Sequence, residues 1–256
     1  MEIRDRVVVV TGGGGGIGGA LCRRFKADGA SQVVVSDIDH RSAEKVAAEV
    51  GGMAVPADVS VESDVRGLVL RTVKEFGRVD IYCSNAGIAI GGGPEVWDME
   101  WRQSWDVHVM AHVYAARALL PGMRARGDGY IVGTISAAAL LNHILAAPYA
   151  VTKAAGLSFF EWMAIAYHDQ GIRVSALCPQ GVRTAMLARE GEGNFLTAGA
   201  LEPEQVADAV VEAIRDERFL ILPHPEVGEF FRRKAADYDR WLRGMRRLRA
   251  RILEER

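Results

Sequence analysis

The distribution of apolar residues along the chain predicts strands and helices in alternation. Seven short runs are mostly unbroken by polar residues, which is typical of parallel strands covered on both faces. They lie at 6–11, 32–37, 53–57, 79–84, 130–136, 172–178 and 219–222. Between them, apolar residues recur at helical spacing, which predicts helices at about 17–28, 41–49, 62–76, 97–126, 149–170 and 203–215.

This alternation favours an α/β fold with a doubly wound parallel sheet, right-handed crossovers and helices on both faces. A TIM barrel has a similar length, but a glycine-rich turn after the first strand favours the open, Rossmann-type sheet of about seven strands. The 256 residues suit a single domain, 1–256, although their number also allows two.

The last segment, residues 225–256, differs in composition from the rest. From residue 229 onward it holds ten Lys or Arg and five Asp or Glu. Its apolar residues recur at spacings of three and four, at Tyr238, Trp241, Leu242, Met245, Leu248 and Ile252. We therefore predict a basic amphipathic helix as a C-terminal extension, whose apolar stripe packs on its own subunit or on a neighbour.

Composition and charge narrow the function. The formal net charge of −2 gives no reason to expect a nucleic-acid partner. No apolar run is long enough to cross a membrane, and the charged start is unlike a signal peptide, so we expect a cytoplasmic protein without a membrane partner. Cys22, Cys83 and Cys178 are widely spaced, which predicts buried, reduced thiols. No Cys/His cluster has metal-ligand spacing, so no metal site is expected.

Five consecutive glycines, at 12–16, connect the first predicted strand to the first predicted helix. Glycines there let the backbone approach a pyrophosphate closely, and the helix N-terminus supplies N–H donors and a favourable dipole. Three registers fit a dinucleotide-binding loop: Gly13-x-Gly15-x-x-Gly18, Gly14-x-Gly16-x-x-Gly19 and Thr11-Gly12-x-x-x-Gly16-Ile17-Gly18.

The second predicted strand ends at Asp37, nineteen residues after Gly18. An acid near this spacing holds the adenosine ribose in dinucleotide-binding proteins. The alternative interpretation of Asp37 is a helix N-cap or turn residue. The glycine loop upstream favours the ribose contact.

Tyr149 and Lys153 form the second informative pattern. Tyr149 alone among six tyrosines has a lysine four residues later, and Pro148 marks a helix start, so both side chains share one face near a helix N-terminus. A phenol has a pKa of about 10, and a nearby ammonium group lowers it toward the range of a useful base. Ser136, at the end of a strand, offers a hydroxyl to a substrate oxygen.

These residues resemble those of the short-chain dehydrogenase/reductase family, in its short, single-domain, NAD-preferring branch. The resemblance covers about residues 7–184. Thr11-Gly12-x-x-x-Gly16-Ile17-Gly18 resembles the family's cofactor loop and selects that register. Other family segments are matched by Asp58-Val59 at the adenine, Asn85-Ala86-Gly87 beside the cofactor, and Pro179-Gln-Gly-Val182-Arg-Thr184, whose threonine reaches the nicotinamide carboxamide in the family.

The resemblance implies hydride transfer between NAD(H) and a secondary alcohol or ketone. Tyr149 is implied to take or give the hydroxyl proton, and Ser136 to position the substrate oxygen. Lys153 is implied to bind the ribose hydroxyls and to lower the pKa of Tyr149. Asp37 stands where NAD-preferring members carry an acid that would repel a 2′-phosphate, so NAD is the expected cofactor.

One position departs from the family pattern. Where the family usually has an asparagine that helps to hold a relay water behind the lysine, this chain has His108. Histidine also donates and accepts hydrogen bonds, so a relay is still compatible with it. The alternative is a packed helix histidine beside the cofactor. We keep His108 among the candidate catalytic residues.

Apolar residues dominate the segments expected around the substrate, at 88–93, 137–147 and 186–201. They predict an apolar secondary alcohol or ketone, such as a steroid, a lipid or a cyclic alcohol. His143 is expected either to orient a polar substrate group or to lie on a surface loop. Residues 188–199 are interpreted as a substrate lid or, alternatively, as a surface loop.

The family usually forms tetramers or dimers through its two long helices, here 97–126 and 149–170. A homotetramer or homodimer is therefore expected, with apolar faces supplied by Tyr114, Ala115, Ala118, Phe159, Phe160, Trp162 and Met163. Two other classes stay open. One is an NAD-binding regulatory protein with little turnover. The other is an epimerase or dehydratase of the extended branch, which would need a larger substrate domain.

Overall fold

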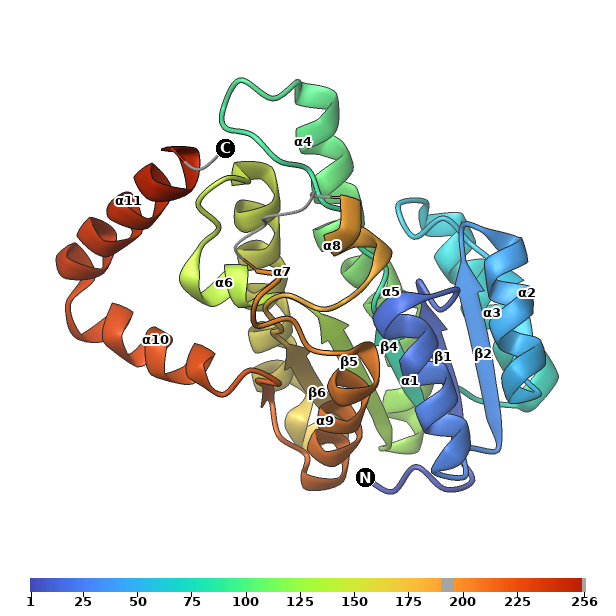
Figure 1. Cartoon of the computed structure of the whole chain (residues 1–256). Coiled ribbons are helices and arrows are strands. Elements are labelled where there is room, and N and C mark those ends of the chain that lie inside the picture. The colour runs from blue at the N-terminus through green and yellow to red at the C-terminus, as the bar shows by residue number, and fades with distance from the viewer. Residues whose placement is uncertain (190–195, 255–256) are drawn as a thin grey trace.

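The computed structural model describes residues 1–189 and 196–254. Seven parallel strands form one sheet, as predicted, and their order is β3-β2-β1-β4-β5-β6-β7 (Figure 1). The strands are β1 Val7–Thr11, β2 Gln32–Asp37, β3 Met53–Pro56, β4 Ile81–Ser84, β5 Gly129–Thr134, β6 Ile172–Leu177 and β7 Leu220–Ile221. The order reverses between β1 and β4, and in doubly wound sheets ligands bind in the crevice at the carboxyl ends of the strands on either side of such a reversal.

Helices cover both faces of the sheet (Figure 1). They are α1 Gly16–Ala27, α2 His40–Val50, α3 Glu62–Phe76, α4 Asp98–Trp105, α5 Ala111–Arg126, α6 Ala137–Leu141, α7 Ala147–Tyr167, α8 Ala185–Arg189, α9 Pro203–Asp216, α10 Glu226–Ala236 and α11 Tyr238–Glu254. Two buried cores result, one beneath α1, α2 and α9 and one beneath α3, α5 and α7. Strands with few polar residues are expected in such a double-sided arrangement.

The helix predicted at 97–126 is divided by a π-helical turn, Asp106–Met110. The N–H of Ala111 donates to the carbonyl of Asp106, five residues earlier, in place of the usual spacing of four. The extra residue was not visible in the apolar pattern. It changes the direction of the side chains that follow, and His108 lies at its centre.

The predicted C-terminal extension is helical, but it is two helices, α10 and α11, and the prediction of one helix was wrong. Asp237 leaves the helical conformation, with φ −153° and ψ 92°. Its carboxylate accepts a hydrogen bond from the N–H of Arg240 at 2.9 Å and so caps the second helix. The two helices form an arm that turns back beside α6 (Figure 1).

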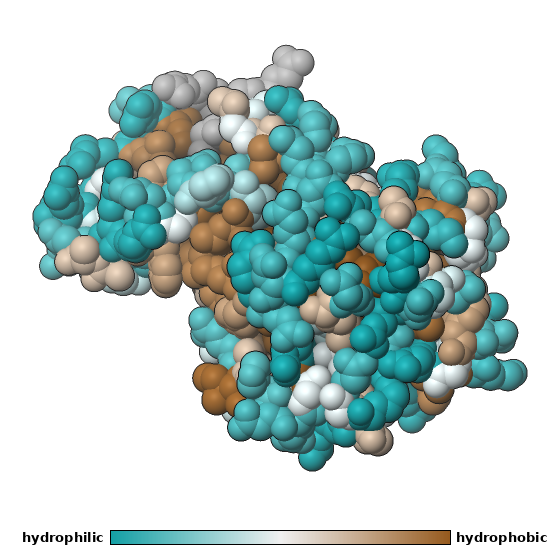
Figure 2. Space-filling model, turned by 90° about the horizontal axis from the view of Figure 1, so that it is seen from below, coloured by the Kyte–Doolittle hydropathy of each residue, from teal (hydrophilic) through white to brown (hydrophobic). Residues whose placement is uncertain are grey.

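Apolar atoms gather in the recess between this arm and the body of the molecule (Figure 2). Phe230 of α10 contacts Trp241 of α11, with ring centroids 6.4 Å apart. Both rings pack against the core that lies beneath α7. Ile252, near the end of α11, is also buried. The apolar stripe of the extension therefore packs, at least in part, on its own subunit.

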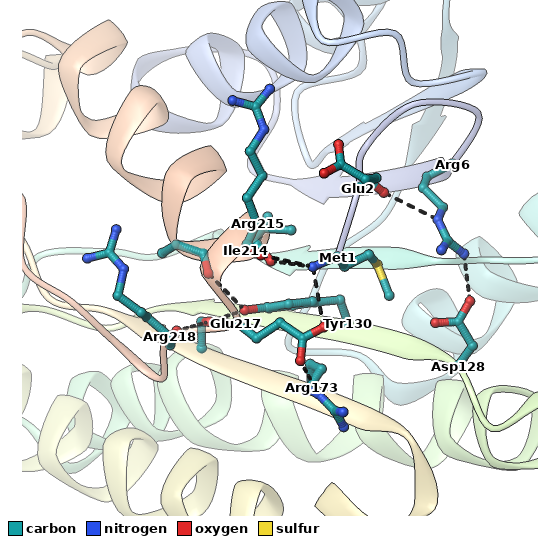
Figure 3. A network of polar contacts seen from close by, with 12 residues as sticks. Met1, Glu2, Arg6, Asp128, Tyr130, Arg173, Ile214, Arg215, Glu217 and Arg218 are labelled. Carbon is teal, nitrogen blue, oxygen red and sulfur yellow. Dashed lines mark hydrogen bonds and ion pairs between the residues drawn. The ribbon is translucent and has the colours of Figure 1, made fainter.

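The amino-terminal edge of β5 and β6 is joined to the end of α9 by polar contacts (Figure 3). The Tyr130 hydroxyl lies 2.8 Å from the Ser175 hydroxyl, and the Ser175 hydroxyl donates to the carbonyl of Arg218. Glu217 pairs with Arg173 at 2.5 Å and with the amino group of Met1 at 3.3 Å. These contacts stabilise the edge of the sheet opposite the one that carries the candidate site.

Among the residues that the structure describes, no helix is long and apolar enough to cross a bilayer. Within the same residues, no group of three or more His, Cys, Asp or Glu side chains is arranged to hold a metal ion.

Candidate active site

The glycine loop lies between the carboxyl end of β1 and the start of α1. Gly12 and Gly16 have positive φ angles of 63° and 51°, which strongly favour glycine. A Cβ atom on Gly18 would lie 2.1 Å from the carbonyl oxygen of Gly12, so no side chain fits there. These three glycines form the Gly12-x-x-x-Gly16-x-Gly18 register, although Cβ atoms on Gly13 and Gly14 would also lie within 2.8 and 2.7 Å of the Val35 and Ser42 side chains.

The start of α1 is suited to an anion. No side chain caps its N-terminus, where Gly15 stands, and a Cβ atom on Gly15 would meet nothing within 4 Å. The first-turn N–H groups, including that of Ile17, have no partner within the helix. An open glycine beside these donors leaves room for a pyrophosphate, so the loop fits a dinucleotide.

Asp37 faces the glycine loop. Its carboxylate accepts hydrogen bonds from the N–H of Gly14 and from the N–H of Asp39, each at 3.0 Å. Asp39, and not Asp37, caps α2 by accepting from the N–H groups of Arg41 and Ser42. The N-cap interpretation of Asp37 was therefore wrong. Ile38, which follows it, is 72% exposed.

Asn85 joins three strand ends across the crevice. Its side-chain N–H group donates to the carbonyls of Thr11 and Gly12, at 3.0 and 3.3 Å. Its side-chain oxygen accepts from the Thr134 hydroxyl at 2.9 Å. The N–H of Ala86, at 3.3 Å, donates to the Thr11 hydroxyl. Asn85 and Ala86 thus fix the base of the glycine loop.

The remaining candidate cofactor residues follow the carboxyl ends of β3 and β6. Asp58 accepts from the N–H of Ser60 at 2.9 Å, and Val59 beside it is buried. The methyl group of Thr184 lies 3.1 Å from the position that a Cβ atom of Gly16 would take. Thr184 is therefore placed directly over the glycine loop.

Residues 179–184 contact the start of α6 at one end and residue Leu201 at the other. The carbonyl of Pro179 accepts from the N–H of Ala137 at 2.8 Å, next to Ser136. Val182 is buried and pairs with Leu201, which closes the base of the predicted lid. The lid itself, 188–199, includes residues 190–195, which lie outside the described residues.

Lys153 and Tyr149 lie on the first two turns of α7, and Pro148 is in its first turn. The Lys153 ammonium nitrogen is 5.7 Å from the centre of the Tyr149 ring and donates to the carbonyl of Thr134 at 2.8 Å. Burial lowers the pKa of Lys153 to about 8. At neutral pH this lysine is still mostly charged, in a place where its field acts strongly on Tyr149.

Ser136 is the N-cap of α6, so its hydroxyl accepts from the N–H of Ala138 at 3.1 Å. The side chain is nearly buried, at 9% exposure. Gly87 faces the same region from the end of β4. A Cβ atom on Gly87 would lie 3.6 Å from both the Lys153 ammonium and the His108 ring.

His108 is fully buried, and both ring nitrogens have protein partners. Nε2 accepts from the N–H of Ile88 at 3.2 Å, so the ring proton lies on Nδ1, which is 2.9 Å from the Thr152 hydroxyl. That hydroxyl donates to the carbonyl of Pro148 at 2.7 Å. Burial, with a smaller contribution from the Lys153 charge, lowers the pKa of His108 to about 2. The imidazole is therefore neutral, and through the Thr152 hydroxyl it supports the backbone at the start of α7.

Two histidine rings flank Tyr149. Edge-on contacts place the His108 ring 5.4 Å and the His143 ring 6.1 Å from the Tyr149 ring, centre to centre. His143 accepts from the N–H of Leu145 at 3.3 Å, which orders its own loop. His143 thus lies at the candidate site.

Other reactive side chains are structural. All three cysteines are buried, and burial raises the pKa of Cys178 to about 12, which keeps it a thiol. His224 is buried, accepts from the N–H of Gln180 and contacts the carbonyl of Gly199. Sequence reasoning missed Thr134 and Thr152, because only the fold brings them to the lysine and the histidine.

Comparison with known proteins agrees with this geometry. Residues 6–194 match the sequence model described as short chain dehydrogenase. A 1-deoxy-11-beta-hydroxypentalenate dehydrogenase of Streptomyces exfoliatus is 34% identical over 239 residues, covering 88% of this chain and 86% of the relative. The 7alpha-hydroxysteroid dehydrogenase of Escherichia coli strain K12 is 32% identical over 195 residues, covering 73% and 75%.

A solved short chain dehydrogenase/reductase from Burkholderia phymatum, in complex with NAD, superimposes with a TM-score of 0.86 at 26% identity, covering 93% of this chain and 96% of that one. A 3-ketoacyl-(acyl-carrier-protein) reductase from Brucella melitensis, complexed with NADH, gives 0.80 at 28% identity, covering 87% and 98%. The site belongs to an oxidoreductase of Rossmann fold. The chain is a member of the short-chain dehydrogenase/reductase family.

Proposed function

We propose that this enzyme transfers a hydride between NAD(H) and an apolar secondary alcohol or ketone. The observation that carries the proposal is the buried Lys153 ammonium beside Tyr149, at the edge of a crevice that starts with a dinucleotide-type glycine loop. When bound, the nicotinamide supplies the hydride acceptor or donor. The protein then has to bind and orient the substrate and to exchange one proton with it.

In the proposed mechanism, the Tyr149 hydroxyl oxygen takes the proton of the alcohol during oxidation and returns it during reduction. The Lys153 charge favours the phenolate form, which makes Tyr149 a useful base near neutrality. The Ser136 hydroxyl donates to the substrate oxygen and so holds it near Tyr149. We also propose that Lys153 contacts the ribose hydroxyls of the cofactor.

For His108 we propose a positioning role through Thr152. Since its nitrogens are taken by Ile88 and Thr152, the neutral ring supports the backbone around Pro148. The proton-relay interpretation remains the alternative. A pH–rate profile of His108→Asn separates them: a relay member changes the apparent pKa of the reaction, whereas a positioning residue lowers the rate at every pH.

NAD is proposed as the preferred cofactor. The Asp37 carboxylate lies over the loop that would bind the adenosine half, where it can accept from ribose hydroxyls and repels a 2′-phosphate. The exposed side chain of Ile38 offers an apolar surface to the adenine. The other proposed cofactor contacts come from the glycine loop with Ile17, and from Asp58, Val59, Asn85, Ala86, Gly87, Pro179, Val182 and Thr184.

The substrate is proposed to be a steroid, a lipid or a cyclic alcohol. The segment between Ser136 and Tyr149 carries the partly exposed Ile144 and Leu145, and relatives of the chain are named as dehydrogenases of a hydroxypentalenate and of a hydroxysteroid. An apolar pocket wall favours an apolar body around the reacting carbon.

Steady-state kinetics with a panel of apolar secondary alcohols, with NAD and with NADP, tests the proposal. We expect NAD-dependent oxidation, and we expect Asp37→Ala to weaken NAD binding by about tenfold or more, because a hydrogen bond to a charged group is lost. The variant should bind NADP no worse than the wild type. An unchanged preference for NAD in Asp37→Ala would contradict the assigned role.

We further propose a homodimer or homotetramer. Trp162 and Ile165 on α7 are 55% and 82% exposed, and Trp105 at the end of α4 is 44% exposed. Tyr114, Ala118 and Phe159 are partly buried nearby. Ala115, Phe160 and Met163 are buried in the subunit itself and cannot contribute, contrary to expectation.

A further inference from the structure

A groove of about 390 Å³ lies between α11 and the loop that leads from α6 to Tyr149. Its apolar wall consists of Ile144 from the loop and of Leu242 and Met245 from α11. The loop and the helix are more than ninety residues apart in sequence, so only the fold brings them together. In Figure 1, α10 leads away from the body of the molecule and α11 turns back toward the loop between α6 and α7.

The second wall of the groove is cationic. Arg243, Arg246 and Arg249 follow one another at intervals of three along α11, and all three line the groove. Among the described residues, Arg243 and Arg246 form no ion pair with an acidic side chain, whereas Arg249 donates to the carbonyl of Ile144 and interacts electrostatically with Glu95. Asp239 is the one acid that lines the groove, so the lining carries two excess positive charges. Arginine side chains in this arrangement suit a carboxylate.

The groove and the candidate active site share one loop. Ile144 directly follows His143, whose ring is in contact range of the Tyr149 ring at 6.1 Å. The side-chain N–H of Arg249 donates to the carbonyl of Ile144 at 3.1 Å, and Lys234 donates to the carbonyl of Leu140 at 2.7 Å. The C-terminal arm is therefore fastened to the segment that joins the two candidate catalytic residues.

We propose that this groove binds the anionic end of the substrate, a carboxylate on an otherwise apolar body whose secondary alcohol reacts at Tyr149. The apolar body would lie along Ile144, Leu242 and Met245, and the carboxylate would be held by Arg243 and Arg246 as specificity-determining residues. This inference rests on the proposed function. The α11 helix lies outside residues 6–194, the part of the chain that matches the family model.

The same helix offers a matched control. Arg247 and Arg251 carry the same charge on α11 but do not line the groove. Replacing them removes as much charge from the arm as replacing Arg243 and Arg246. A general effect of net charge on the approach of an anion would therefore appear in both double variants. Binding of a carboxylate in the groove would be weakened only when Arg243 and Arg246 are replaced.

The test uses three hydroxy acids, on a steroid, a long-chain and a cyclic skeleton, each as free carboxylate and as methyl ester. Calorimetric titration into the NADH-loaded enzyme gives affinity, and NAD reduction gives KM and kcat. For at least one skeleton the wild type should prefer the acid. The R243M/R246M variant should then weaken binding of the acid by about fivefold to tenfold, from the loss of two partly exposed ion pairs. Binding of the ester to R243M/R246M should stay within about twofold of its binding to the wild type. Binding of the acid to R247M/R251M should also stay within about twofold of the wild-type value.

The outcomes separate the two claims. If an acid binds in an arginine-dependent way but no compound is oxidised or reduced, the groove stands and the proposed reaction fails. If esters and acids bind equally on all three skeletons, or if R247M/R251M has the same effect as R243M/R246M, the groove does not bind a carboxylate. Turnover of the esters would in that case leave the reaction class intact.

Discussion

At the scale of single residues, the candidate site depends on ionisable groups that the fold keeps away from water. His108 and His112 are both buried, and burial lowers the pKa of His112 to about 3. His112 lies 2.7 Å from the Ser84 hydroxyl, and its ring contacts Phe160. Both imidazoles therefore stay neutral in the folded protein at pH values where they become protonated in the unfolded chain.

This burial predicts acid sensitivity. Between pH 6.5 and the lowered pKa values near 2 and 3, the unfolded chain binds more protons than the folded one, so stability falls as the pH falls. From pH 7 to pH 5, each histidine should contribute a loss of about 2 kcal/mol. In denaturant titrations, His108→Asn should lose about 2 kcal/mol less over this interval than the wild type. Equal losses in both proteins would show that His108 is protonated in the folded state.

Some residues of the site can be predicted from the sequence, and others cannot. Tyr149 and Lys153 are four residues apart just after a proline, so they can be recognised as neighbours on one turn of a helix. Ser136 can be recognised because it follows a predicted strand. Thr134 and Thr152 form no such pattern, since each meets its partner across the packed interior. The neutral state of His108 was also beyond prediction, because it depends on the N–H of Ile88, twenty residues away.

At the scale of elements, the strand–loop–helix unit at the start of the chain carries the cofactor argument. The five glycines of the loop are not equivalent, although they look identical in the sequence. Gly12 and Gly16 are required by backbone conformation, Cβ atoms on Gly13 and Gly14 would lie 2.8 and 2.7 Å from the side chains of Val35 and Ser42, and Gly15 is restricted by neither effect. Gly18, beyond the run of five, is required by a close approach to Gly12. Only the structure could select among the registers on physical grounds.

Two alanine substitutions test this distinction. Gly18→Ala places a methyl group 2.1 Å from a backbone oxygen, so we expect a loss of about 2–3 kcal/mol of stability and weaker NAD binding. Gly15→Ala, with φ near 180° and open space around the new Cβ, should lower the thermal midpoint far less, by no more than the preference for glycine over alanine at a helix N-cap. The comparison requires thermal melts of both variants without cofactor. A stable Gly18→Ala protein would show that the helix start is placed differently.

At the scale of the whole molecule, the apolar pattern predicted every strand of the sheet and the parallel arrangement of the strands. Apolar runs with few polar residues are clear signals, because a doubly covered sheet leaves little room for polar residues. The π-helical turn and the break at Asp237 were missed, since each depends on backbone hydrogen bonds and leaves the helical spacing almost unchanged. The short helices α6 and α8 were missed because five residues carry too little periodicity.

The exposed apolar face of α7 predicts assembly. Ile165→Lys places a charge among side chains that we expect to be buried between subunits, which should shift the protein toward smaller species in light scattering. Because Ile165 is 82% exposed in the single subunit, the same change should leave its thermal midpoint nearly unchanged. A wild-type protein that is monomeric at micromolar concentrations would contradict this expectation.

The central claim, proton exchange by Tyr149 during hydride transfer to NAD, is tested most directly by Tyr149→Phe. The measurement is NAD reduction by the best alcohol of the panel, with calorimetric NAD binding measured on the same samples. We predict that the variant binds NAD within about threefold of the wild type and loses at least about a hundredfold in kcat, because general base catalysis contributes that much. A variant that retains wild-type kcat while binding NAD normally would contradict the assignment of Tyr149.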